Sequence, residues 1–575
     1  MKKNSIALLL LLLCRMAYMP LSAQENENKV TLNGSARAVM FNDHLSEDTA
    51  VPDTITAPKQ NSGHTLVDLG INIRPNKNIE IQGMVRIRND FGGFWGSGIT
   101  FDERQLFVKG VIANTVRYQL GDINYKLTPY TFINNDVLIS KYIPAQFHQF
   151  SSEIDYDNFY DNDHTWRQQG VATDFALVFK KYLEELDFNG FTSRIHTSGA
   201  GENERLFSGV NITLVQSRYL SLGWNYVNLY DIAGTSNNPA TYHNPVNTAT
   251  AAINYNFGKW EFTAGGEAGI SKSFYDSLSA APSLSDYFAD GTVQVKFIPA
   301  HIYLGINYKS VGPDFRSPGA QTQRLNFSGF PRAYDRITND QMLRPISMLD
   351  IFRDAALYNL QLQSNLMAYD PKYDNITPYG TATPNRQGTS LNAGFSDNKQ
   401  IVEVTAGYHM LTEIRGQGTF NLREFNRMEA NATLHADKLI SNYKKLLRVQ
   451  VSFNSDNTTR TGQDGVAPVD LQSTIVSAGI EAETAARLDV LAGWQTVSYS
   501  GFEFLPDVDL YGNIIYFNEY AVDGNEQLTG AGLRYRFTND IYLTGMYNHF
   551  TWENSATEIP SYSINEFAFI FKMNF

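Results

Sequence analysis

The sequence predicts an all-β protein, a transmembrane antiparallel β-barrel of about 22 strands, within a range of roughly 16–24, with long extracellular loops. Three observations predict this class. Apolar and polar residues alternate along most of the chain, short and long connections follow one another, and an aromatic segment ends the chain. A soluble β-sandwich shares the alternation, but the length of the segments and their polar second face distinguish a membrane barrel from it.

Alternating segments recur through the chain. In residues 79–88, Ile, Gly and Val occupy one face of the predicted strand, whereas Glu, Gln, Met and Arg occupy the other. Successive strand side chains point to opposite faces, so each segment has an apolar and a polar side. The segments run for ~10–12 residues, the length that a tilted strand needs to cross a bilayer, against ~5–6 in a soluble sandwich. Because lipid tolerates no open sheet edge, such strands must close into a barrel. The same alternation occurs in residues 302–309, 402–410, 447–454 and 530–537.

The connections between these segments differ in length. Outer-membrane barrels have short periplasmic turns and longer extracellular loops. Short-turn hairpins supply about 20 strands, and residues 30–41 and 563–575 add one each, which gives the even number typical of bacterial barrels. Short turns are expected at 75–78, 113–115, 180–185, 216–218, 257–259, 298–300, 397–399, 437–445, 483–486 and 538–540. The longer polar segments are 125–170, 230–248, 310–387 and 500–525.

The composition excludes several other classes. The 575 residues are 43% hydrophobic and 13% aromatic, which excludes intrinsic disorder. Apolar runs approaching ~20 residues are absent beyond the N-terminus, so a helical membrane protein is excluded as well. The formal net charge of −13 argues against a nucleic-acid partner, because phosphate binding needs a basic surface.

Residues 1–23 are predicted to be a secretory signal peptide, and residues 24–575 a single transmembrane barrel domain. Lys2 and Lys3 precede an apolar stretch, and residues 21–23 form a small-residue cleavage site. Cys14 is the single cysteine and lies within the peptide. The mature chain is therefore expected to have no disulfide bonds and no thiolate metal ligands.

The C-terminal segment carries the most specific signal. An aromatic strand that ends on Phe resembles the signal that outer-membrane barrels present to their insertion machinery. Together with the signal peptide and the alternating strands, it resembles the porin-like outer-membrane barrels of Bacteroidota. This resemblance implies a multi-pass barrel in the outer membrane of a Gram-negative cell, in contact with outer-membrane lipid and with the barrel-insertion machinery. The predicted insertion signal consists of Phe567, Phe569, Phe571 and Phe575, which share one face.

The polar faces of the strands predict which residues line the lumen. Rings of fixed charge set the ion preference of a pore. The arginines on these faces form either an anion-attracting ladder or part of a generic polar lumen with internal ion pairs, and the sequence leaves both alternatives open. The candidate pore-lining residues are Glu80, Arg86, Arg88, Arg117, Asp122, Glu403, Arg448, Arg534 and Arg536.

Residues 310–387 form the longest connection. A barrel of about 22 strands has a wide lumen that comparable barrels keep plugged. No N-terminal plug is expected here, because the first predicted strand begins soon after the predicted cleavage site. The sequence leaves two alternatives for this connection: it folds inward and constricts the pore, or it caps the barrel from outside. A short amphipathic helix is expected within it, at residues 347–360.

No cofactor, metal or catalytic site is predicted. An acidic cluster in the segment 125–170 does not have the spacing of a helix-loop-helix calcium loop, so a solvated surface loop is the preferred interpretation. The ten histidines are scattered, and no nucleophile and base stand at a recognisable spacing, so the protein is not expected to be an enzyme. The acidic cluster consists of Glu153, Asp155, Asp157, Asp161 and Asp163.

The function that these observations favour is a porin-like channel for the passive passage of small hydrophilic solutes. The alternative is a barrel component that anchors an outer-membrane secretion or assembly complex. The channel is preferred because the chain is almost entirely barrel, whereas such components often carry a periplasmic domain. The sequence does not specify the solute, the oligomeric state or whether the pore is open.

Overall fold

The structure is a computed structural model that describes residues 29–47, 59–90, 99–133, 144, 147, 168–199, 201–277, 283–320, 371–378, 380–439, 445–463, 465–508, 514–558 and 560–575. The predicted signal peptide, the acidic cluster at 153–163 and the helix expected at 347–360 lie outside these residues. Within the described residues, no helix is long and apolar enough to cross a membrane.

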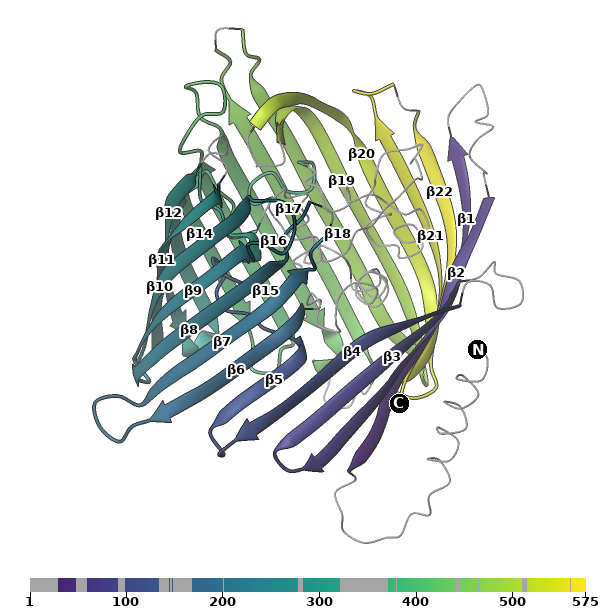
Figure 1. Ribbon diagram of the computed structural model, residues 1–575. Helices are drawn as coiled ribbons and strands as arrows, with labels where there is room; N and C mark the ends of the chain where they lie inside the picture. Colours follow the sequence, from purple (N-terminus) through teal and green to yellow (C-terminus); the bar gives the residue numbers. More distant parts are fainter. Residues whose placement is uncertain are drawn as a thin grey trace, which may run out of the picture.

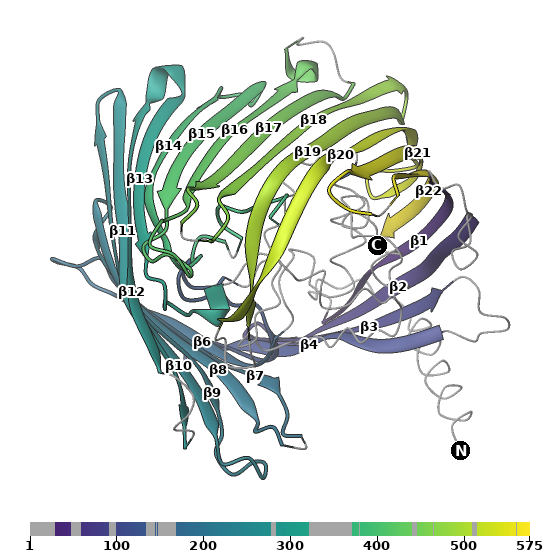
Figure 2. The same cartoon turned by 90° about the horizontal axis from the view of Figure 1, so that it is seen from above.

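Twenty-two strands form one closed antiparallel sheet (Figures 1 and 2). Each strand pairs with the next in the chain, and the first pairs with the last, which confirms the predicted class and number of strands. The strands of the first half are β1 (Val30–Glu47), β2 (Lys59–Asn76), β3 (Ile79–Asp90), β4 (Ile99–Ile112), β5 (Val116–Ile123), β6 (Gln168–Val178), β7 (Glu185–His196), β8 (Arg205–Ser217), β9 (Leu220–Asp231), β10 (Thr241–Phe257) and β11 (Trp260–Asp276). Those of the second half are β12 (Leu284–Phe297), β13 (Ile302–Val311), β14 (Arg386–Ser396), β15 (Val402–Thr412), β16 (Glu424–His435), β17 (Leu447–Arg460), β18 (Val469–Ala485), β19 (Leu488–Val508), β20 (Ile514–Arg536), β21 (Ile541–Asn554) and β22 (Tyr562–Asn574). The described residues also contain three short 3₁₀ helices, η4 (Ile298–Ala300), η5 (Pro318–Ala320) and η7 (Ala436–Lys438).

The short turns lie at the end of the barrel where β1 begins and β22 ends, which we call the short-turn end. Residues 77–78, 113–115 and 258–259 connect consecutive strands there, as predicted. Between β4 and β5, Ala113 and Asn114 both have positive φ values, 52° and 56°. Positive φ at two successive residues is the requirement of the hairpin turn whose twist matches that of the strands, and Asn accepts it readily.

The prediction of a long loop is wrong for two segments. Residues 500–525 belong mostly to strands, because β19 continues to Val508 and β20 starts at Ile514. The connection expected at 230–248 shrinks to residues 232–240. At the end of the barrel away from the short turns, strands pair beyond the apolar band. β19 and β20 run for 21 and 23 residues, longer than a membrane crossing needs, so strand continues where a loop was expected.

The faces of each strand differ in burial as the alternation requires. On β3, Val85 points outward and is 47% exposed, whereas Arg86 and Arg88 point inward and are buried. On β22, Phe567 and Phe569 point outward and are exposed, whereas Glu566 points inward and is buried. The exposed apolar side chains form the surface that contacts lipid.

Inward-facing apolar residues form two large clusters. One lies on β1 and β18–β22 and includes Phe41, Leu528 and Phe550, together with Phe147 from the connection after β5. The other lies on β5–β13 and includes Phe207 and residues of two inward-folded connections. A water-filled lumen would leave such side chains wet, so their burial shows that chain occupies part of the interior.

Candidate functional site in the barrel lumen

Part of the longest connection lies inside the ring of strands (Figure 2). Residues 371–385 precede β14, and residues 372–375 contact five successive strands, from β16 to β20. We call residues 372–375 the latch. Their positions show that this part of the 310–387 connection turns into the lumen rather than over the outside of the barrel.

Lys372 and Tyr373 of the latch both bind Glu526 of β20. The Lys372 Nζ lies 3.1 Å from Glu526 Oε1, and the Tyr373 hydroxyl donates to the same oxygen at 3.0 Å. Ser473 of β18 donates its hydroxyl to the carbonyl oxygen of Lys372. The side chains of Lys372 and Glu526 are 7% and 0% exposed, so the ion pair is shielded from water. A carboxylate at this depth needs a cation and hydrogen-bond donors, because burying an unpaired charge is costly.

Asp374 and Asn375 bind the neighbouring strands. Arg427 of β16 donates to Asp374 Oδ1 at 2.8 Å. The Asn375 side-chain amide donates to Thr458 of β17 at 2.9 Å and to Glu503 of β19 at 3.0 Å. The latch is therefore held by charged and hydroxyl groups of separate strands, two of which accept hydrogen bonds from its own Asn375 amide.

Arg386, the first residue of β14, fixes the backbone that follows the latch. Its guanidinium donates to the carbonyl oxygens of Ile376 at 2.9 Å and Asn375 at 3.2 Å. The same group lies 3.7 Å above the ring of Phe425. The two hydrogen bonds and the ring contact leave the latch little freedom relative to the barrel wall.

One further connection, after β5, and the first part of the longest connection, after β13, fold inward on the opposite wall. Residues 124–133, which follow β5, reach β11 and β12: Thr128 donates to Glu267 at 2.7 Å, and the Tyr130 hydroxyl donates to Asp290 at 2.5 Å. Residues 312–320, which follow β13, pack on them, and Ser317 donates to the carbonyl oxygen of Tyr130 at 2.7 Å. The Tyr130 ring also stacks on Phe288, with ring centroids 3.9 Å apart.

Three groups in these connections have shifted pKa values: burial raises the pKa of the Tyr125 and Tyr130 hydroxyls, and the pKa of the Asp314 carboxyl is lowered. Burial raises the pKa of the Tyr130 hydroxyl above its ordinary 10.0, and the nearby Asp290 raises it further, so the hydroxyl stays a donor. Hydrogen bonds from Arg415 lower the pKa of the Asp314 carboxyl below its ordinary 3.8. The Asp314–Arg415 contacts of 2.6 and 2.8 Å join residues 312–320 to the connection after β15.

The two ends of the lumen differ in exposure. Near the short-turn end, the side chains of Arg117 and Lys109 are 72% and 45% exposed. At the level of the latch, the side chains of Arg423 and Arg427 are each 6% exposed. Solvent therefore reaches the lumen wall from the short-turn end, whereas the wall around the latch is covered.

Three of the predicted pore-lining arginines lie together near the short-turn end, each beside a carboxylate. Arg534 contacts Glu481 and lies 2.7 Å from Asp489. Arg536 lies 2.8 Å from both Glu483 and Asp489, and Arg448 lies 3.8 Å from Glu481.

The remaining candidates are distributed around the wall. Arg86 forms an ion pair with Asp68 at 2.6 Å, and Arg88 is buried on the same face of β3. Glu80 lies 3.1 Å from Lys109, and Arg117 contacts Asp174. Asp122 accepts a hydrogen bond from the backbone N–H of Leu106. Glu403 is half-buried at the start of β15. The structure brings these residues to the lumen side of the barrel in several groups rather than one ring. That they line an open pore stays a prediction.

One row of contacting residues on β14–β16 has the residue types of a hydrolase, although only its Ser390–His409 contact is a hydrogen bond. His409 Nδ1 lies 2.8 Å from Ser390 Oγ, and His409 Nε2 lies 3.6 Å from Glu429. Ser390 is only 5% exposed, so a substrate carbonyl has no room beside its hydroxyl. We interpret the row as a structural contact between strands. No cluster of His, Cys, Asp or Glu with metal-binding geometry is found among the described residues.

The predicted insertion signal lies at the junction of the first and last strands. The backbone N–H of Phe575 donates to the carbonyl of Gly34 at 2.9 Å, and that of Gly34 donates to the carbonyl of Phe575 at 2.8 Å. Phe575 and Phe569 are 51% and 47% exposed on the lipid side. Their role in insertion stays a prediction.

No protein-family model matches the chain, and no curated protein matches it. Among solved structures, the chain is similar to the ferric citrate transporter FecA in its unliganded form, with a TM-score of 0.49, 10% identity and coverage of 94% of this chain and 79% of that one. It is also similar to OccK8 (OprE) of Pseudomonas aeruginosa, with a TM-score of 0.36, 8% identity and coverage of 95% and 98%. The translocation pore of the P pilus usher PapC gives a TM-score of 0.35, 8% identity and coverage of 94% and 99%. These likenesses concern the barrel architecture and assign no activity.

The closed sheet, its apolar outer face and its polar inner face define an outer-membrane β-barrel of porin-like architecture, located in the outer membrane as a multi-pass protein.

Proposed function

We propose that this protein is an outer-membrane channel for small hydrophilic solutes, and that the latch and the connections packed opposite it narrow the lumen. The observation that carries the proposal is the set of buried contacts between residues 372–375 and β16–β20. A barrel used only as an anchor has no need of a charged segment held inside it. The exposed polar wall near the short turns supports a path for water and solutes up to the latch.

The proposal is tested by replacing residues 321–378 with a Gly/Ser linker. None of the described residues of this segment, 371–378, takes part in strand pairing, so the barrel should still fold and keep its heat-modifiable migration in gels. Single-channel conductance in a planar bilayer should rise several-fold, and cells carrying the variant should become sensitive to large antibiotics.

A matched control replaces residues 233–238, in the connection between β9 and β10, with a linker of the same composition. These residues lie outside the latch contacts, so conductance should stay at the wild-type value. A folded 321–378 variant with unchanged conductance would reject the constriction. It would favour the alternative in which the barrel anchors a larger complex, and stoichiometric partners should then co-purify.

A further inference from the structure

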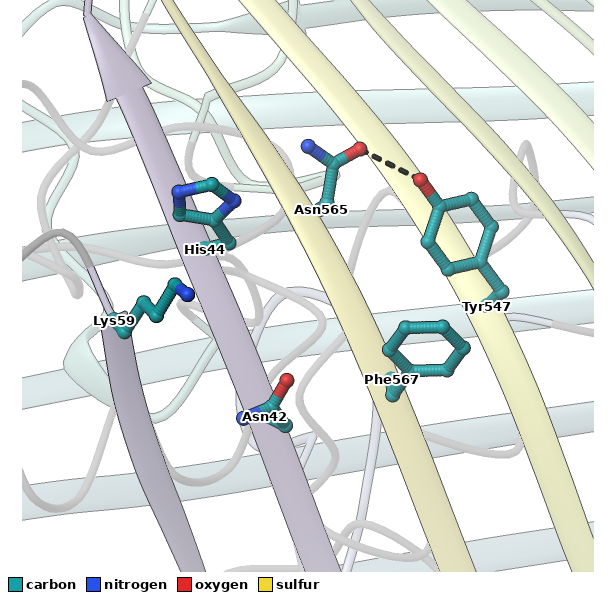
Figure 3. A pocket seen from close by; sticks show the side chains of 6 residues that line it. All are labelled: Asn42, His44, Lys59, Tyr547, Asn565 and Phe567. Carbon is teal, nitrogen blue, oxygen red and sulfur yellow. Dashed lines mark hydrogen bonds between the residues drawn. The ribbon is translucent and has the colours of Figure 1, made fainter.

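A groove of about 650 Å³ lies on the outside of the barrel, across the seam where β1 meets β22 (Figure 3). It is outside the lumen, because its β1 residues alternate with the buried Phe41 and Asp43. The lining residues are Asn42 and His44 of β1, Lys59 of β2, Tyr547 of β21, and Asn565 and Phe567 of β22.

Strand register arranges these residues in two rows across four neighbouring strands. Lys59, His44, Asn565 and His549 are successive cross-strand partners and form the upper row. Asn61, Asn42, Phe567 and Tyr547 form the row below, nearer the short-turn end. Below that follow Gly63, Met40, Phe569 and Gly545. The upper row is therefore cationic and polar, the middle row contains both polar and aromatic side chains, and the lowest row is apolar.

The position of the groove matches the far boundary of the apolar band. His44 lies ten residues along β1 from Gly34, the partner of Phe575. At ~3.3 Å per residue and a strand tilt of roughly 40°, this separates the groove from Phe575 by about 25 Å along the barrel axis, the height of the apolar band of an outer-membrane barrel. Because the short turns are periplasmic in such barrels, the groove faces the headgroups of the outer leaflet.

The chemistry of the upper rows favours an anion. Lys59 is exposed and forms no ion pair with any of the residues that the structure describes. The two upper rows contain no carboxylate. Asn565 accepts the Tyr547 hydroxyl at 2.7 Å through its Oδ1, and His549 Nδ1 lies 2.8 Å from the same atom, which leaves the Asn565 amide nitrogen available as a donor (Figure 3). A cation beside neutral donors suits a phosphate group.

We propose that this groove binds a phosphate-bearing lipid of the outer leaflet. The phosphate lies against Lys59 and His44, and an acyl chain descends over Phe567 and Phe569. Aromatic residues at the boundary and an apolar row beneath it fit a lipid, whereas a soluble anion would use only the upper row.

The test uses the full chain in phosphatidylcholine vesicles that contain a small share of spin-labelled phosphatidic acid or, separately, spin-labelled phosphatidylcholine. Electron spin resonance measures the motionally restricted fraction of each label. The wild type should restrict phosphatidic acid several-fold more than phosphatidylcholine. Lys59→Gln should remove most of this preference, and Lys59→Arg should keep it. Heat-modifiability confirms that each variant is folded.

Lys181→Gln is the matched control, because Lys181 is an exposed lysine in the β6–β7 turn at the opposite end of the barrel. It should leave the preference unchanged. An equal loss in Lys181→Gln would show a diffuse effect of charge and overturn the site, as would an unchanged preference in Lys59→Gln. Loss of the preference in excess inorganic phosphate would show that the groove takes the free ion, which also overturns the proposal.

Discussion

At the scale of single residues, several interior charges are buried in pairs of opposite sign. Arg86 pairs with Asp68, and Lys372 pairs with Glu526, with side chains less than a tenth exposed in both pairs. Between the two alternatives that the sequence left open, these contacts favour internal ion pairs. Deep burial makes the members of such a pair interdependent, because neither is stable alone in a shielded site.

The pair between Lys372 and Glu526 yields a prediction. Lys372→Met leaves a buried carboxylate without its cation, and breaking a buried pair in this way typically costs about 3–5 kcal/mol. The free energy of unfolding in urea should fall, or the latch should leave its place and conductance should rise. Adding Glu526→Gln to Lys372→Met should recover most of the loss. If the double variant is no better than Lys372→Met, the two side chains do not act as a pair.

At the scale of elements, the last strand has two different faces with separate tasks. Its outward Phe side chains contact lipid, while Glu566 and Ile570 face the interior and are buried. Its end is held to β1 by the reciprocal hydrogen bonds between Phe575 and Gly34. The strand is thus both the proposed insertion signal and one side of the seam.

We expect Phe575→Asp to lower the amount of barrel in the outer membrane and to leave unfolded chain in the periplasm. The physical reason is that an aspartate replaces an aromatic side chain at the membrane boundary, where the terminal signal is proposed to be read. Membrane fractionation with heat-modifiability gels measures the effect. Phe420→Asp serves as control, because Phe420 is 90% exposed in the connection after β15 and should tolerate the change. Normal levels of folded Phe575→Asp would refute the signal.

The strands could be predicted from the sequence because the alternation within each strand reflects lipid on one face and the lumen on the other. Residues 79–88 alternate between lipid and lumen, and the structure places Val85 and Arg86 on the faces that the alternation assigns. Strand ends were harder to predict. β19 and β20 run for 21 and 23 residues, longer than a membrane crossing needs, so the segment 500–525 was expected to be a loop although most of it forms a hairpin.

The latch could not be predicted for a related reason. Lys372, Asp374 and Asn375 are polar residues in a long connection, which is the composition of a solvated loop. Their partners, such as Arg427 and Glu526, lie far away in the sequence and meet them only when the barrel closes. Sequence patterns within one segment carry no record of such pairings, so the direction of the connection remained open.

At the scale of the whole molecule, charge is balanced along the exposed wall near the short turns. Arg117, Arg448, Arg534 and Arg536 each lie beside a carboxylate. Fixed charges of one sign are needed for strong ion preference, and pairing them with the opposite sign removes most of the field. We therefore expect the channel to discriminate weakly between anions and cations.

The reversal potential in a potassium chloride gradient measures this preference. It should be small in the wild type and shift toward anions in Asp174→Asn, which leaves the exposed Arg117 without its partner. Asp174→Glu keeps the charge and should behave as the wild type. A strong anion preference in the wild type would contradict the balanced wall and support the arginine ladder.

The seam between β1 and β22 also determines the order of events during assembly. The ring joins residues near the start of the chain, such as Ser35, to Asn574 at its very end. The outer edge of β1 therefore lacks its partner in the ring until β22 is in place. An open edge is a template for pairing with any other strand. Whatever occupies that edge in the meantime must leave when β22 pairs with β1 and closes the ring.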